Sequence, residues 1–184
     1  MRALVVYESM YGNTHVVASN IADGLRATHE VTLVPVAEAT ADLVAGADLL
    51  VVGGPTHMHG LSSAASRRMA AEAAAKPASG LNLDPDACGP GLRDWLKGIG
   101  GLRVGPALAA AFDTRLNGVP AFTGHASRGI ARMAKRHGYR LIAAPESFLI
   151  GQQNTLADGE ASRARRWGAA LGVIATSINL PAPA

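Results

Sequence analysis

Disulfide bonds, membrane spans and a strongly acidic surface are all missing from this sequence. Its 184 residues include a single cysteine, Cys88, so an internal disulfide is excluded and a reducing compartment is favoured. No apolar run approaches the roughly 18–20 residues of a membrane-spanning helix. The chain opens on a strand pattern without a basic-then-apolar segment, so we expect no secretory signal and a cytoplasmic location.

Neither sign of charge dominates. The 17 lysines and arginines outnumber the 14 acidic residues by three, and aromatic residues make up only 4% of the chain. The arginines are scattered over predicted helices, without the basic and aromatic cluster of a nucleic-acid-binding surface. The length and the 48% hydrophobic content predict one domain over residues 1–184 with a full core.

Strand-like and helix-like segments alternate along the chain, which predicts an α/β fold with a parallel sheet. Strands are predicted at residues 2–7, 31–35, 48–52, 107–112 and 141–150. Helices are predicted at residues 14–26, 40–46, 62–75, 91–99 and 127–137, and a last helix starts near Asp158. Residues 76–90 are rich in proline, glycine and aspartate, which predicts a surface loop.

The loop after the first predicted strand combines hydroxyl groups with a glycine, in the order Ser9-Met10-Tyr11-Gly12-Asn13-Thr14. A strand, a short loop and a helix N-terminus together suit a phosphate group, because the first helical turn leaves its N–H groups unpaired. Gly12 permits a close backbone approach. The loop lacks the lysine of a Walker A loop and the three spaced glycines of a dinucleotide-binding turn. A ligand-free turn capped by Asn13 is the alternative interpretation.

A second loop, Gly53-Gly54-Pro55-Thr56-His57-Met58-His59-Gly60, follows the third predicted strand. His57 and His59 would share one side of an extended segment, as two metal ligands do. No third ligand lies near them in the sequence, so we favour packing or hydrogen bonding and predict no metal site. In a doubly wound sheet the loops after strands 1, 3 and 4 converge at one crevice.

The first loop resembles the phosphate loop of the flavodoxins, whose usual pattern is Thr/Ser-x-Thr-Gly-Asn-Thr. The chain matches this pattern at Ser9, Gly12, Asn13 and Thr14 and departs from it at Tyr11, where a threonine is usual. The run Ser-Met-Tyr-Gly and the later Gly-x-Pro-Thr are similar to the flavodoxin-fold NAD(P)H:quinone reductases. Residues 91–96, 111–115 and 145–148 resemble small flavodoxin-like proteins common in actinobacteria.

This resemblance implies a flavodoxin-like three-layer sandwich with a five-stranded parallel sheet in the order 2-1-3-4-5, and FMN as the cofactor. The implied phosphate site is Ser9, Met10, Tyr11, Gly12, Asn13 and Thr14. The implied ring site is Pro55, Thr56, His57, Met58, His59 and Gly60 on one side and Asp113, Thr114 and Arg115 on the other. No catalytic acid or base is predicted, because the flavin carries the chemistry. Arg115 near the ring would raise the flavin potential, whereas a surface salt bridge is its alternative role.

Three roles remain open at this point. An electron carrier would expose one ring edge to a redox partner protein. A quinone-type reductase would bind NAD(P)H and a small electron acceptor, and its relatives are usually homo-oligomers. Electron-shuttling flavodoxins are usually acidic, unlike this chain. The third role is a flavodoxin-fold interaction or regulatory module without flavin, favoured by the bulky Tyr11 ring in the phosphate loop.

Overall fold

A computed structural model describes residues 1–77, 79–100, 107–119 and 123–179. The strands are β1 (Arg2–Tyr7), β2 (Glu30–Pro35), β3 (Leu49–His57), β4 (Gly60–Leu61), β5 (Ala107–Leu116), β6 (Tyr139–Leu141) and β7 (Glu146–Ile150). The helices are α1 (Asn13–Leu25), α2 (Ala41–Gly46), α3 (Ala64–Ala74), α4 (Leu92–Gly98), α6 (Ala126–Arg136) and α7 (Glu160–Asn179), with a short 3-10 turn η1 (Val36–Glu38). Within these residues no helix is both long and apolar enough to span a bilayer.

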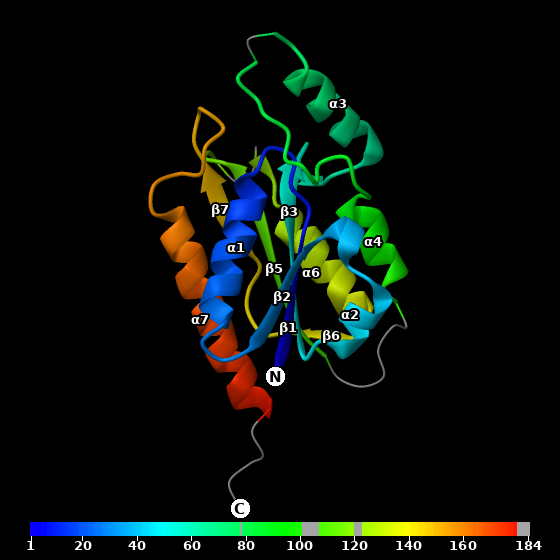
Figure 1. Ribbon diagram of the computed structural model, residues 1–184, viewed down its shortest axis with the longest axis vertical. Helices are drawn as coiled ribbons and strands as arrows, with labels where there is room; N and C mark the ends of the chain where they lie inside the picture. The colour runs from blue at the N-terminus through cyan, green and yellow to red at the C-terminus, as the bar shows by residue number, and fades with distance from the viewer. Residues whose placement is uncertain (78, 101–106, 120–122, 180–184) are drawn as a thin grey trace, which may run out of the picture.

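The strands form one sheet between two layers of helices. Its order is β2-β1-β3-β5-β6, and the neighbours in this path are parallel. Helices α1 and α7 cover one face of the sheet, and α2, α4 and α6 cover the other (Figure 1). This arrangement confirms the expected three-layer fold and its strand order.

The fifth position of the sheet is divided between two strands, where the sequence predicts one continuous strand. β6 pairs with the start of β5, and β7 pairs with residues 112–116 of β5. Pro145 lies between them and has no N–H group for the ladder. Together with the two-residue β4, which runs antiparallel to β3, this division gives seven strands in the described residues instead of five.

The sheet separates two apolar cores. Leu4 and Val6 of β1 point to the α2, α4 and α6 side, whereas Ala3 and Val5 point to the α1 and α7 side. The central strands β1 and β3 are buried on both faces, as expected for a parallel sheet covered by helices.

Helices α1 and α7 touch through two glycines. A Cβ atom on Gly24 would lie 2.1 Å from the carbonyl oxygen of Arg165, and one on Gly168 would lie 2.2 Å from that of Ile21. Both distances are far below van der Waals contact, so any side chain would force the helices apart. This close contact places α7 against the face of the sheet that carries α1.

Gly168→Ala tests this contact. We expect the substitution to lower the free energy of unfolding by about 1–3 kcal/mol, because the new methyl group overpacks the helix interface. Urea unfolding followed by circular dichroism measures the change. Gly98→Ala is the matched control, since a Cβ on Gly98 meets no atom within 4 Å. Equal losses in the two variants would contradict the packing argument.

Candidate functional site

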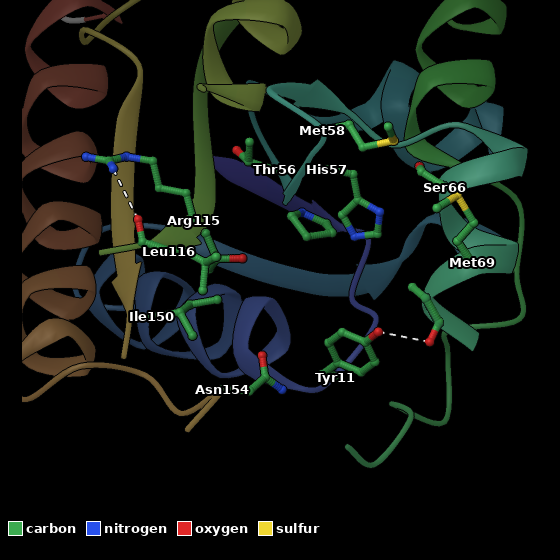
Figure 2. A pocket seen from close by; sticks show the side chains of 13 residues that line it. Tyr11, Thr56, His57, Met58, Ser66, Met69, Arg115, Leu116, Ile150 and Asn154 are labelled. Atoms are coloured by element: carbon green, nitrogen blue, oxygen red, sulfur yellow. Dashed lines mark hydrogen bonds between the residues drawn. The ribbon is translucent and has the colours of Figure 1, made fainter. Parts of the chain in front are cut away.

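Three loops meet at the carboxyl ends of β1, β3 and β5, and a cavity of about 310 Å³ opens between them (Figure 2). Its walls come from the loop after β1, the end of β3, helix α3, the end of β5 and the segment after β7. The lining residues are Tyr11, Pro55, Thr56, His57, Met58, Ser66, Met69, Ala70, Thr114, Arg115, Leu116, Ile150 and Asn154.

The loop after β1 ends in a left-handed glycine. Gly12 has φ +87° and precedes the first residue of α1, and its N–H donates to the Ser9 Oγ at 3.1 Å. The first N–H groups of α1, from Asn13 to His15, have no acceptor within the helix. They stand at the positive end of the helix dipole, so the loop has the geometry of an anion site.

The side chains of this loop bind the protein itself. The hydroxyls of Thr14 and Thr114 are 2.7 Å apart, and the Asn13 amide donates to the carbonyl of Asn154 at 2.8 Å. The hydroxyl of Tyr11 donates to the carbonyl of Ala70 in α3 at 2.9 Å, at one end of the cavity (Figure 2). The side chains therefore anchor the loop, and the backbone N–H groups remain for a ligand.

β3 and β4 form a tight hairpin whose turn is Met58-His59. Both residues have positive φ, 45° and 73°, in a position where Asn-Gly is preferred. Each such conformation costs on the order of 1 kcal/mol in a residue with a side chain. Met58 is 77% exposed at the mouth of the cavity, and a bridge from His59 to Gly124 holds the turn.

The end of β5 contributes a cation to the cavity. Arg115 lines it and donates through Nη1 to the Thr123 hydroxyl at 2.9 Å and the Gly118 carbonyl at 3.1 Å. Its Nε is buried and has no hydrogen-bond partner among the described residues. Within the described residues, the hydrogen-bond partners of Arg115 are neutral oxygens, which differs from the salt-bridge alternative. Asp113 is buried and accepts the N–H of Ser127 at the start of α6.

The structure brings seven of the fifteen predicted site residues to the cavity wall: Tyr11, Pro55, Thr56, His57, Met58, Thr114 and Arg115. Ser9, Gly12, Asn13 and Thr14 form the adjoining loop. Four predicted residues lie elsewhere. Met10 borders a second cavity beneath α3, His59 and Gly60 border a groove beside α6, and Asp113 is buried against the start of α6.

Six lining residues were not predicted. Ser66, Met69 and Ala70 come from α3, and Leu116, Ile150 and Asn154 come from the ends of β5 and β7 and the loop that follows. Their local sequence has no ligand signal. Only the parallel register, which places the carboxyl ends of the strands together, could have suggested the two strand-end residues.

The described part of residues 76–90 forms the surface loop that its composition predicts, but Asp84 within this loop is buried. The N–H of Asp84 donates to the Met10 carbonyl at 2.8 Å, and the Asp84 side chain is only 2% exposed. Its Oδ2 lies 3.4 Å from His15 Nδ1 and 4.0 Å from the position of a Cβ on Gly12. A buried carboxylate therefore stands directly beside the anion-site loop.

Comparisons with known proteins agree with this geometry. Residues 5–84 match the family model of flavodoxin. No curated protein gives a significant sequence match. Among solved structures, an archaeal flavodoxin shares 18% identity and a TM-score of 0.65, with 96% of this chain and 99% of the other covered. Flavodoxin 1 of Bacillus cereus shares 16% identity and a TM-score of 0.62, with coverages of 98% and 100%.

The same fold occurs as part of a larger enzyme. Rubredoxin oxygen:oxidoreductase of Desulfovibrio gigas matches 96% of this chain over 36% of its own length, with 16% identity and a TM-score of 0.64. The structure thus defines a flavodoxin-like α/β fold with a cavity at its topological switch point. Residues 5–84 match the flavodoxin family model, and the chain shares the fold of flavodoxins.

His57 gives the site a testable pH dependence. Burial lowers its pKa below the ordinary value of 6.5, and the charge of Glu8 opposes this shift. Below about pH 6.5 the unfolded chain takes up a proton here before the folded chain does, so the free energy of unfolding falls as the pH falls. We expect His57→Gln to reduce this slope in urea unfolding between pH 7.5 and 5 (about one unit on each side of the ordinary pKa).

His29 lies away from the cavity and also has a pKa lowered by burial. His29 is present in both the wild type and His57→Gln. The difference between their slopes of unfolding free energy against pH therefore reports the contribution of His57. Coincident slopes for the wild type and the variant would contradict the assignment.

Proposed function

We propose that the chain binds FMN at this cavity and acts as an electron-transfer flavoprotein. The single observation that carries the proposal is the junction of the anion-site loop with the cavity at the switch point of the sheet. In this arrangement the backbone N–H groups at the start of α1 hold the phosphate. The ring lies between the β3–β4 hairpin and the end of β5.

The residues at the cavity fit this cofactor. The volume of about 310 Å³ suits a planar ring system with its phosphate outside, at the loop. The buried Nε of Arg115 is a free donor for an electron-rich ring edge. The ring of Tyr11 lines the cavity wall with its hydroxyl bound to α3, which supports a flavin site over a module without flavin.

FMN would supply the chemistry, because its ring accepts and releases one or two electrons. The protein supplies placement and access. Arg115 brings positive charge to the ring site, which favours the reduced, more negative ring. Met58 and Met69 are 77% and 56% exposed at the mouth, so an acceptor reaches the cavity past flexible, apolar side chains.

The acceptor is either a small molecule such as a quinone or a redox partner protein. Turnover separates these two roles. NADPH oxidation with a quinone in the absence of an added reductase would identify an enzyme. Quinone reduction only after an added reductase has reduced the protein would identify a carrier.

Gly12→Val tests FMN binding. We expect the variant to lose detectable FMN binding, because the isopropyl group blocks the backbone approach of the phosphate. Titration of FMN into the protein, followed by quenching of flavin fluorescence, measures the affinity. Gly138→Val is the matched control: Gly138 has a similar φ of +84° after α6, so both variants bear the same backbone strain. Absence of quenching in the wild type would refute the proposed function, and unchanged affinity in Gly12→Val would refute the phosphate placement.

Asp84→Asn provides a second test of FMN binding, in which the affinity should rise and not fall. The buried carboxylate of Asp84 repels a phosphate at the Gly12 loop, so we expect Asp84→Asn to tighten FMN binding about fivefold, or about 1 kcal/mol. The same fluorescence titration measures it. Asp94→Asn, which removes an exposed carboxylate paired with Lys97 on α4, is the control and should leave the affinity unchanged. Weaker binding in Asp84→Asn would place the phosphate elsewhere.

A further inference from the structure

A second concave site lies on the other side of the β3–β4 hairpin from the cavity. It is a groove of about 520 Å³ between β4, α4 and the first turns of α6. Its lining includes the cationic side chains of Arg93, Arg128 and Arg132 and the imidazoles of His59 and His125. No acidic residue lines it among the residues that the structure describes.

The two arginines on α6 are exposed and uncompensated. Arg128 and Arg132 lie one helical turn apart on the same face, where like charges repel. Helix α6 contains no aspartate or glutamate, and in the described part of the chain neither arginine has a hydrogen bond or ion pair. Two adjacent guanidinium groups without a protein partner raise the local positive potential and suit an anion.

Arg93 contributes a third guanidinium that is already held in place. Its Nε donates to the Ser62 carbonyl at 2.9 Å, and its Nη2 donates to the Leu61 carbonyl. No hydrogen bond among the described residues uses its Nη1. Because two backbone carbonyls fix this side chain, a ligand would not have to order it, which lowers the entropy cost of binding.

The start of α6 is not itself the anion site. The N–H of Ala126 donates to the Thr56 hydroxyl at 2.9 Å, and that of Ser127 donates to the Asp113 carboxylate at 2.7 Å. The attraction for an anion therefore comes from the arginine side chains of α4 and α6. Helices α4 and α6 lie on the same face of the sheet (Figure 1).

We propose that this groove binds the diphosphate group of a nucleotide. Arginine guanidinium groups bind phosphate oxygens in pairs, and three of them around one groove match a ligand with two adjacent phosphates. The volume of the groove lies within the roughly 300–1,000 Å³ of small-molecule sites, which favours a small ligand over an acidic protein. His57 and Met58 border the cavity, and His59 and Gly60 border the groove. A nicotinamide dinucleotide in the groove would thus lie beside the proposed flavin site.

Calorimetric titration of the purified chain, with saturating FMN added, tests the proposal. The probes are ADP, NADPH and inorganic pyrophosphate. We expect ADP to bind and its affinity to fall as salt rises from about 0.05 M to about 0.3 M, because the charges become screened. The double variant Arg128→Gln/Arg132→Gln should bind ADP at least about tenfold more weakly, since it loses two charge-assisted contacts. Tighter binding of NADPH than of ADP would identify a dinucleotide as the ligand, and the reverse would identify a free nucleoside diphosphate.

Arg165→Gln/Arg166→Gln is the matched control. It removes the same charge from two exposed arginines of α7, on the opposite face of the sheet, and should bind ADP as the wild type does. Equal losses in the two double variants, or no binding of any probe to the wild type, would overturn the proposal. Binding of polyglutamate without binding of ADP would also overturn it, in favour of an acidic partner protein. FMN binding is measured separately, so its absence would refute the proposed function without deciding the role of the groove.

Discussion

The pairing of β3 with β1 on one side and β5 on the other positions everything else at this site. The parallel ladder between β3 and β5 continues as far as Pro55 and Thr114, and the N–H of Glu8 donates to the Gly53 carbonyl at 3.0 Å. The three strands therefore end close together, and their loops meet. The Thr56 hydroxyl then accepts the N–H of Ala126, so β3 also positions α6 and the groove. A shift of one residue in this register would turn every side chain to the other face of the sheet.

Local patterns in the sequence predict the fold well. The unbroken apolar runs of the inner strands and the four-residue spacing of apolar residues in α1 are local properties, and the structure confirms these elements within a residue or two at most boundaries. The division of the fifth strand at Pro145 was missed, although a proline within a strand pattern is a local signal. β3 and β5 extend further than their apolar runs, because the ladder continues into residues whose composition suits a loop.

The site is less predictable, because its walls come from distant segments. Asn13 and Asn154 are 141 residues apart, and Tyr11 reaches Ala70 across 59 residues. No local pattern marks Asn154 or Ala70 as a neighbour of the loop. The burial of Asp84 could not be predicted from the sequence for the same reason, because residues 76–90 have the aspartate- and proline-rich composition of an exposed loop. The net charge is misleading in a similar way, because a value of +3 does not reveal the buried carboxylate of Asp84 beside α1 or the unpaired arginines on α6.

Helix α3 is attached to the molecule by polar contacts at its ends more than by a buried apolar face. Its fully buried residue is Ser66, which also forms the capping box with Ser63, and the Tyr11 hydroxyl binds near its last turn. Helices α1 and α6 bury several apolar side chains each. Local opening costs least where little apolar surface is buried, so α3 should open well below the free energy of global unfolding. One wall of the cavity can therefore change its position while the sheet and the other walls stay folded.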